Sequence, residues 1–260
     1  SVTEIGSQAF NKCTSLETIT IPNSVTKVES FAFSNCTNLS KISLSKNLTD
    51  LCHHAFENCA KLTEITIPKS LESCSGGFEG PFYHSGLNKV NFEEGITKIP
   101  QYLFSDATAL ETIAIPDTVT LIGGEVFSDC SALKNVTIPD SVTEIGSQAF
   151  NKCTSLETIT IPESIKELGN YAFYGCTSLS AIKFPSLITE IGSGMCDGCT
   201  SLVTVKMGDK VTSIGDNAFQ NCTSLKNITL SPETEYINSY AFSNCDALEN
   251  IVIPDKVPVI

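Results

Sequence analysis

The side chains best suited to redox, metal or nucleophilic chemistry in this chain are its 12 cysteines and three histidines. Nine of the cysteines share one position of a 23-residue repeat: Cys13, Cys36, Cys59, Cys130, Cys153, Cys176, Cys199, Cys222 and Cys245. A linear ladder of this kind offers no natural pairing, so the spacing predicts free, buried thiols that pack as small apolar side chains. Cys196 and Cys199 form a C-x-x-C string, but no second pair stands at zinc-ligand spacing. We therefore expect neither a zinc site nor a redox centre.

The histidines are His53, His54 and His84, and a metal or nucleophile site would have to use them. Cys52 and Cys74 lie in the same or the following repeat, so a Cys/His group is conceivable there. Cys74 takes an apolar slot of the repeat, however, and His53 and His54 take polar turn slots, which predicts solvated histidines. The sequence contains no P-loop, G-x-S-x-G, H-E-x-x-H or calcium-loop string. We therefore expect no catalytic residues, no cofactor and no metal.

Charge and composition exclude two classes of partner. The net charge is −13, and all 16 basic residues are lysine, so the chain has no arginine for phosphate or base-edge recognition. An acidic surface without arginine argues against nucleic-acid binding and against docking on anionic lipid. Hydrophobic residues make up 41% of the chain, enough for a core, but the apolar runs are too short for direct membrane insertion.

A 23-residue period organises nearly the whole sequence, which predicts stacked coils rather than a globular domain. Eleven units start at Ser1, Ser24, Asn47, Ser70, Gly95, Thr118, Ser141, Ser164, Leu187, Lys210 and Glu233, and positions below are counted from these residues, leaving out the two extra residues of the fourth unit. Position 16 is leucine in every unit, position 19 is isoleucine or valine, and position 10 is phenylalanine in nine. Residues 1–22 are identical to residues 141–162, which indicates a recent block duplication.

Each segment of the unit has a predicted conformation. Residues 16–21 end in alternating β-branched residues and read as a short strand, which Pro22 stops because proline has no N–H for the ladder. Val25 and Val28 point inward from a second extended piece. The spacing from Ala9 to Leu16 fits one or two turns of helix with one buried face. Because one coil cannot bury its apolar positions alone, stacked coils must share a core.

The segment "IGSQAFNKCTSLETITIPNSV" and its recurring A-F-x-x-C-x-x-L-x-x-I-x-I-P string resemble the BspA-like leucine-rich repeats of bacterial and some protist surface proteins. The resemblance covers essentially all of residues 1–260. It implies an α/β repeat fold: a right-handed, curved solenoid of about 11 coils, with parallel strands on the concave face and short helical turns on the convex face. It also implies an extracellular or cell-surface binding role, often in adhesion, without supplying a ligand.

One unit departs from the pattern, at residues 70–94. It is two residues longer than the others, glycine-rich, and lacks the cysteine and the alanine-phenylalanine pair in register. We expect a bulged convex loop in which Phe78 or Phe82 fills the aromatic slot. Exposed aromatic side chains around Phe82 and Tyr83 would make this loop a ligand contact; otherwise the loop is a tolerated insertion that adjusts the curvature of the solenoid.

The default interaction surface is the concave face, where position 20 points outward between two inward residues. We call these eleven residues the threonine-rich stripe: Thr20, Ser43, Thr66, Asn91, Ala114, Thr137, Thr160, Lys183, Lys206, Thr229 and Val252. With strands about 4.8 Å apart, the stripe would be on the order of 50 Å long. Threonine also serves β-propensity and cross-strand contacts, so the stripe is either a ligand surface or a purely structural feature.

Neither end shows a polar capping repeat, so the chain is expected to be a single solenoid domain cut from a longer protein. Val2 and Ile5 at one end, and Val257, Val259 and Ile260 at the other, would then be exposed or self-associate end to end. The sequence predicts a noncatalytic binding module for an unknown protein or glycan at the cell exterior. The alternative is a structural spacer that presents another domain, and an enzyme built on the Cys/His group ranks last.

Overall fold

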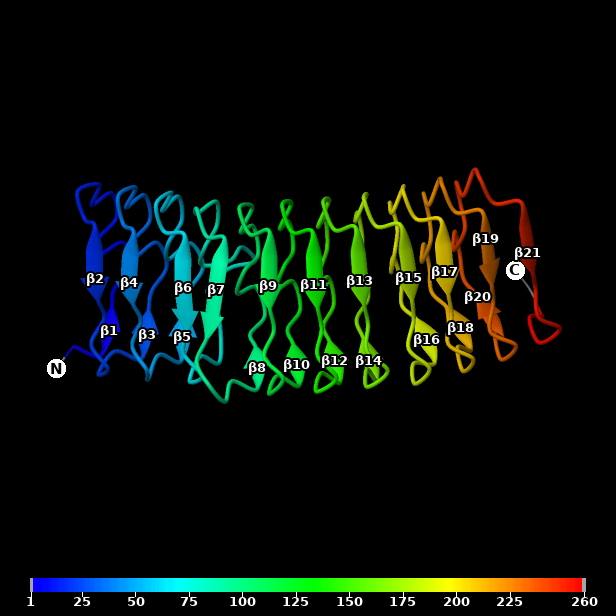
Figure 1. Ribbon diagram of the computed structural model, residues 1–260, viewed down its shortest axis with the longest axis horizontal. Helices are drawn as coiled ribbons and strands as arrows, with labels where there is room; N and C mark the ends of the chain where they lie inside the picture. The colour runs from blue at the N-terminus through cyan, green and yellow to red at the C-terminus, as the bar shows by residue number, and fades with distance from the viewer. Residues whose placement is uncertain (1, 259–260) are drawn as a thin grey trace.

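A computed structural model describes residues 2–258, which form one continuous stack of coils with two runs of parallel strands (Figure 1). The longer strands are β2 (Thr18–Thr20), β4 (Lys41–Ser43), β6 (Glu64–Ile67), β7 (Lys89–Phe92), β9 (Thr112–Ala114), β11 (Asn135–Thr137), β13 (Thr158–Thr160), β15 (Ala181–Lys183), β17 (Thr204–Lys206), β19 (Asn227–Thr229) and β21 (Asn250–Val252). The two-residue strands are β1 (Glu4–Ile5), β3 (Lys27–Val28), β5 (Asp50–Leu51), β8 (Lys98–Ile99), β10 (Leu121–Ile122), β12 (Glu144–Ile145), β14 (Glu167–Leu168), β16 (Glu190–Ile191), β18 (Ser213–Ile214) and β20 (Tyr236–Ile237). The predicted parallel solenoid of about 11 coils is therefore confirmed.

Strand pairing follows the repeat, because each residue pairs with the residue at the same position of the next coil. Thr18 lies opposite Lys41, and Glu4 lies opposite Lys27, each one unit further along the chain. Along the longer strands the middle residue is buried or half-buried and its neighbours point outward, as the alternation predicted. Val25 and Val28 are fully buried, so the second extended piece also faces the core as expected.

The predicted short helical turns are wrong: no segment within residues 2–258 is a helix. The connecting segment is a series of tight turns whose N–H groups alternate between two acceptors. Asn11 N donates to Gln8 O (3.0 Å) and Cys13 N donates to Phe10 O (3.1 Å), both within the coil. Phe10 N, between them, donates to Ala32 O of the next coil (2.7 Å). A helix would instead direct every N–H to the residue four earlier.

Left-handed backbone at two positions of the unit produces this alternation. Gln8 (φ 58°) and Lys12 (φ 61°) illustrate positions 8 and 12, and most units repeat the same conformation there. Each such residue ends one turn and redirects the chain, so helical hydrogen bonding cannot propagate. Non-glycine residues adopt this conformation at a cost of about 1–3 kcal/mol, which the hydrogen bonds between coils offset.

An aromatic stack fills the core. Consecutive phenylalanine rings lie in near-parallel planes, with centroids from 5.0 Å apart at the first pair to 6.1 Å apart at the widest, through Phe10, Phe33, Phe56, Phe82, Phe104, Phe127, Phe150 and Phe173. Cys196 takes the slot in the ninth unit, and the stack resumes with Phe219 and Phe242 at 5.5 Å. The stack gives successive coils a shared apolar interior that no single coil could form.

The cysteine ladder lies beside this stack. All 12 cysteines are free thiols, in agreement with the prediction; along the ladder, Cys13 is exposed, Cys245 is half-buried and the rest are buried. From the second ladder cysteine onward, each Sγ donates to the position-10 carbonyl oxygen of the preceding coil, as Cys153 does to Phe127 O at 3.1 Å. The thiol therefore packs as a small apolar group and supplies a weak donor to a buried carbonyl.

The irregular unit inserts its extra residues before the aromatic slot. Phe82 lies eight positions after Cys74, whereas Phe10 lies five positions after Ile5. Leu87 then lies five positions after Phe82, whereas Leu16 lies six after Phe10, so the net gain is two residues. Phe82 nevertheless fills the slot, is fully buried and stacks on Phe56 at 5.6 Å. The expectation that Phe82 is an exposed ligand contact is therefore wrong, because the aromatic stack takes it into the core.

The insertion itself lies on the surface, anchored at both ends. The Asp50 carboxylate accepts the Ser73 hydroxyl (3.0 Å), the Ser75 N–H (3.1 Å) and the Ser75 hydroxyl (2.5 Å). At the other end Gly80 is buried against the next coil, where an added Cβ would lie 2.6 Å from Ser105 O. Between these anchors Phe78 is 75% exposed.

The ends of the stack agree only in part with the expectation of exposed apolar residues. Val2 is exposed, whereas Ile5 and Val257 are half-buried and pack against the core. Val259 and Ile260 lie outside the described residues. End-to-end self-association remains a prediction.

Candidate functional site

The threonine-rich stripe forms one aligned row on the longer-strand face. Thr20 lies opposite Ser43, Thr66 opposite Asn91, and Lys183 opposite Lys206 in the parallel ladders. All eleven side chains are exposed except that of Asn91, which is half-buried. The structure therefore brings the sequence-predicted stripe together as a continuous surface along the stack.

Ion pairs occupy part of this surface. Lys183 Nζ lies 2.5 Å from Glu163 Oε1, and Ser186 N donates to the same carboxylate at 2.8 Å. Lys183 and then Ser186 hold the pKa of Glu163 at about 2. Lys206 has no ion-pair partner within residues 2–258 and leaves a cation available on the same face.

A groove opens on this face between β4 and β6. These two strands belong to different ladders, since β4 pairs with β2 and β6 pairs with β7. Two adjoining hollows of about 370 and 290 Å³ lie here and share Ile42, Ser43 and Thr66. Lys41 and Glu64 line the first, and Leu44, Pro68 and Glu93 line the second. The groove offers hydroxyls, opposite charges and an apolar floor at two residues of the stripe.

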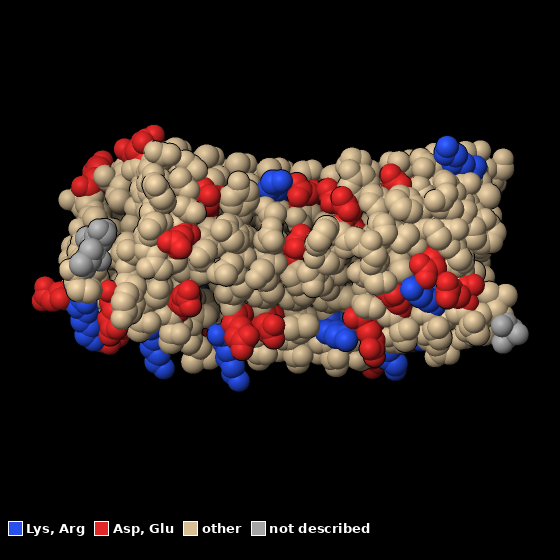
Figure 2. All heavy atoms as spheres, turned by 180° about the vertical axis from the view of Figure 1, so that it is seen from behind, with Lys and Arg blue, Asp and Glu red and all other residues tan. Residues whose placement is uncertain are grey.

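A second hollow, of about 310 Å³, lies beside the insertion of the irregular unit. We call it the acidic hollow; it is lined by Phe78, Glu79, Tyr83, Ser105, Asp106, Glu125, Ser128, Asp129 and Asn151. Figure 2, the view from behind, shows acidic groups scattered across that face, with most of its lysines near the lower edge. Tyr83 is half-buried rather than exposed; of the two predicted binding residues of the loop, Phe82 and Tyr83, it is the one that lines this hollow.

Two carboxyl groups of the acidic hollow, those of Asp106 and Glu125, are unfavourably placed as anions. Burial raises the pKa of Asp106, with Asp129 adding to the rise and the Ser105 hydroxyl opposing it. Burial also raises the pKa of Glu125, against a hydrogen bond from Tyr102. Burial therefore makes the charged forms of these two carboxyl groups costly unless a cation approaches them.

Burial makes Cys52, Cys59 and Cys196 poor nucleophiles. Burial raises the pKa of the Cys52 thiol to about 11 and that of Cys59 to about 12, and it raises the pKa of Cys196 well above its ordinary value. A reactive cysteine needs the opposite shift, toward the thiolate. Within residues 2–258, no three His, Cys, Asp or Glu side chains converge to hold a metal ion.

The expectation of solvated histidines is wrong for His53 and His54. His54 stacks between Phe31 (centroids 4.8 Å) and Tyr83 (4.7 Å), and His53 Nδ1 lies 2.9 Å from the Ser30 hydroxyl. The turn slots they occupy are tight, so aromatic rings from adjacent coils stack there. His84 is exposed, as predicted.

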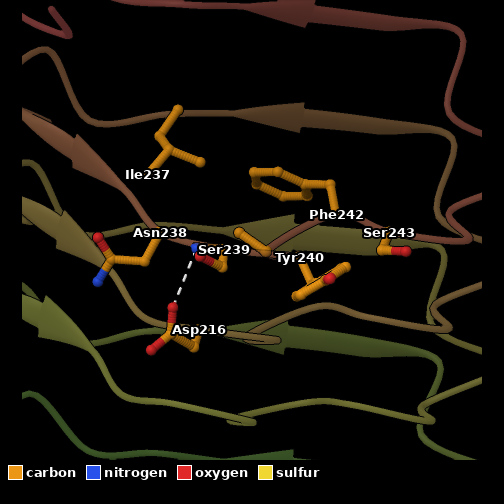
Figure 3. Close-up of a pocket in the computed structure, with 8 residues that line it drawn as sticks. Asp216, Ile237, Asn238, Ser239, Tyr240, Phe242 and Ser243 are labelled. Carbon is orange, nitrogen blue, oxygen red and sulfur yellow. Dashed lines mark hydrogen bonds between the residues drawn. The ribbon is translucent and has the colours of Figure 1, made fainter. Parts of the chain in front are cut away.

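A larger hollow, of about 840 Å³, lies against β20 and the turn that follows it (Figure 3). Its lining includes Asp216, Tyr240 and Phe242, and Ser239 N donates to Asp216 Oδ1 at 3.0 Å. In the preceding coils the same positions are covered by the next coil. The hollow follows from its place in the stack and carries no ligand-specific chemistry.

No helix within residues 2–258 is long and apolar enough to cross a membrane.

Solved bacterial leucine-rich repeat proteins share this fold. A leucine-rich repeat protein from Bacteroides ovatus is 27% identical, with 98% of this chain and 77% of that chain covered and a TM-score of 0.56. A leucine-rich cell surface protein from Faecalibacterium prausnitzii is 28% identical, with 96% and 82% covered and a TM-score of 0.53. A leucine-rich repeat protein from Eubacterium ventriosum is 24% identical, with 98% of this chain and 77% of that chain covered and a TM-score of 0.66. At this identity the likeness shows a shared fold and nothing more. No curated protein matches the chain.

The family model of the BspA-type leucine-rich repeat region, which spans six copies of the repeat, matches residues 1–111, 98–223 and 143–260. Together these matches cover the entire sequence. The regular A-F-x-x-C-x-x-L-x-x-I-x-I-P string, the coil length and the parallel stack agree with that match. The chain belongs to the BspA-type leucine-rich repeat family.

Proposed function

We propose that the chain is a noncatalytic binding module at the cell exterior, with the longer-strand face as its surface for a protein or glycan ligand. The observation that carries the proposal is the threonine-rich stripe, which runs uncovered and in register along the stack. Hydroxyl, amide and ammonium groups at regular spacing suit an extended ligand that makes repeated hydrogen bonds. Solenoids commonly use such continuous faces for binding.

The groove between β4 and β6 is the proposed focus of that surface. Ser43 and Thr66 supply hydroxyls, while Ile42, Leu44 and Pro68 provide an apolar base. Most ligand sites combine an apolar lining with a few polar groups that fix orientation. Because β4 and β6 are not joined by a strand ladder, facing backbone groups of these strands can also bind a ligand.

The noncatalytic part of the proposal rests on the side chains themselves. Burial raises the pKa of the Cys52 and Cys59 thiols, and His54 is enclosed by aromatic rings rather than paired with a nucleophile. The cell-exterior part rests on the family and on the Faecalibacterium prausnitzii relative, which is described as a cell surface protein.

A spacer that presents another domain is the second candidate function. The identity of residues 1–22 and 141–162 favours it, because exact repetition adds length without adding a distinct ligand site. A spacer would need no ligand on the stripe.

The test compares variants that add negative charge on the threonine-rich stripe with variants that add it elsewhere. Beads coated with the chain are applied to an array of glycans and purified cell-surface proteins, and spots bound by the wild type are measured again with a triple variant, Thr66→Glu, Thr137→Glu and Lys183→Glu. We expect at least a tenfold loss of bound beads. The matched control is Thr154→Glu, Thr200→Glu and Lys210→Glu, which makes the same charge change at exposed residues outside the stripe.

Retained binding by the stripe variant, or equal loss in both triple variants, would overturn the stripe as the ligand surface. A wild type that binds no spot above uncoated beads would favour the spacer. Thermal unfolding of each variant checks that the coils remain folded.

A further inference from the structure

We propose that the acidic hollow is a second binding site, distinct from the longer-strand face, which takes a lysine or arginine side chain of a basic peptide segment. The proposal does not depend on the function proposed for the threonine-rich stripe. It rests on an excess of carboxylates, an aromatic rim and a buried acceptor without a partner.

The carboxylates outnumber the cations at this site. Glu79, Asp106, Glu125 and Asp129 all line the hollow. Among the described residues the one lysine that pairs with them is Lys152, whose Nζ lies 3.8 Å from Asp129 Oδ1. The remaining basic groups facing the site are histidines. His54 Nε2 lies 3.8 Å from Glu79 Oε2, and His84 is close enough to lower the pKa of Asp106.

Aromatic side chains rim the hollow. Phe78 is 75% exposed yet held in place by an edge-to-face contact with Tyr102, with ring centroids 6.1 Å apart. Tyr83 lines the same hollow and stacks with His54. An exposed aromatic ring beside carboxylates suits a cation whose alkyl stem needs apolar contact and whose charged end needs anions.

A buried acceptor without a partner gives independent support. Asn151 lines the hollow with only 9% of its surface exposed, and its Oδ1 atom has no hydrogen-bond partner. Its Nδ2 atom donates to Gln148 Oε1 at 3.2 Å, so the oxygen is the atom of this amide that lacks a partner. A buried acceptor of this kind costs about 1–3 kcal/mol. An ammonium or guanidinium N–H entering the hollow would satisfy it.

The spread of the acids favours an organic cation over a metal ion. Within residues 2–258 no three of them converge at metal-binding distance. They instead surround a space of about 310 Å³, which is large enough for the end of a long side chain. A guanidinium or ammonium on a flexible stem can meet carboxylates on several sides, whereas Ca²⁺ needs ligands about 2.3–2.6 Å away on all sides.

The sequences of the coils explain why the acids gather at this place. Position 12 carries Lys12 and Asn35 in the first two units, but Asp106 and Asp129 in the fifth and sixth. The irregular unit adds Glu79 and the aromatic rings of Phe78 and Tyr83 to the same hollow as Asp106 and Asp129. Asn11 in the first unit also has an Oδ1 without a partner, but it lacks the adjacent aspartates, so it provides a matched control for Asn151.

The experiment uses the full chain and two synthetic peptides, Gly-Lys-Arg-Lys-Gly and its Gly-Gln-Gln-Gln-Gly counterpart. The chain has no tryptophan, so a Phe78→Trp variant carries one indole whose fluorescence reports on the rim. We expect the basic peptide to bind and change this fluorescence, and the glutamine peptide to leave it unchanged.

Charge-neutral variants locate the site. A Glu79→Gln, Asp106→Asn pair in the Phe78→Trp background should weaken binding at least tenfold. Asp117→Asn with Asp140→Asn removes two exposed acids elsewhere and should change it less than twofold. Asn151→Leu should weaken binding, whereas Asn11→Leu should not. Because Asp106 and Glu125 have raised pKa values, binding should weaken as the pH falls from 7 towards 4, before most other carboxyl groups protonate.

Three outcomes would overturn the proposal. The first is basic-peptide binding of equal strength in the two charge-neutral pairs, which would mean attraction by net charge alone. The second is no fluorescence change with the basic peptide. The third is displacement of the peptide by Ca²⁺ at a concentration tenfold lower than the concentration of lysine amide that displaces it at the same ionic strength. That result would assign the hollow to a metal ion.

Discussion

Two stretches of identical sequence, residues 1–22 and 141–162, have different surroundings in the stack. Phe10 is half-buried and stacks on one ring, whereas Phe150 is fully buried between Phe127 and Phe173. The difference comes from neighbouring coils, since within residues 2–258 a ring stacks on one face of Phe10 and on both faces of Phe150. Burial in this protein is therefore a property of the stack, not of the unit.

The polar residues of the two stretches differ in the same way. Lys152 pairs with Asp129 of the preceding coil, whereas Lys12 has no ion-pair partner within residues 2–258. Asn151 lines the acidic hollow, whereas Asn11 has no aspartate beside it. Duplication therefore preserves the fold of a unit, and divergence of the adjacent units gives one copy its chemistry.

The largest contrast in stability is expected at the aromatic slot. Phe150→Ala should lower the free energy of unfolding by about 3–5 kcal/mol, because it opens a cavity in the middle of the ring stack. Phe10→Ala should cost about 1–2 kcal/mol, since one face of its ring has no partner ring. Urea unfolding followed by circular dichroism measures both. Equal losses would mean that the first coil is packed as tightly as the seventh.

A smaller contrast is expected at the cysteine ladder. Cys153→Ala removes the Sγ–H donor to Phe127 O and should cost about 1–2 kcal/mol. Alanine fits this slot, since Ala107 occupies it in the fifth unit and is fully buried. Cys13→Ala should change stability by less than about 0.5 kcal/mol, because that side chain is exposed. The same urea series checks the order, and a larger loss at Cys13 would contradict it.

The smallest contrast is expected at the lysines. Lys152→Gln breaks an exposed ion pair with Asp129 and should lower stability by at most about 0.5–1 kcal/mol. Lys12→Gln should have no measurable effect. Adding 0.5 M NaCl should remove the difference between the two variants, because salt screens exposed pairs. A difference that persists in salt would point to packing of the lysine stem instead.

Much of the fold could be predicted because the repeat makes each position visible eleven times. The leucines, the phenylalanine stack, the free thiols and the alignment of the threonine-rich stripe all follow from spacing. The turns could not be predicted from the apolar pattern alone, because the positions of Ala149, Phe150, Cys153 and Leu156 face inward both in a helix and in a series of tight turns. Position 12 held the missing signal, since Asn, Asp or Gly occupies it in eight of eleven units and these residues favour left-handed backbone.

The acidic hollow was harder to predict. Its acids come from three units, and Glu79 enters through an insertion whose register the sequence did not reveal. Placing Phe82 in the core and Phe78 at the surface required the stacked rings of the neighbouring coils. His54 was misjudged for the same reason, because its aromatic partners lie one unit before and one unit after it in the sequence.

Residue-specific alkylation tests most directly the claim that the stack determines the properties of each unit. Trypsin cleavage after lysine separates the two cysteines into residues 13–27 and residues 153–166, which differ in sequence and can be quantified by mass spectrometry. Under native conditions we predict that iodoacetamide modifies Cys13 at least a hundredfold faster than Cys153, which is fully buried and whose pKa is raised well above its ordinary value by burial. In denaturant the two rates should become equal. Equal rates in the native protein would contradict the claim.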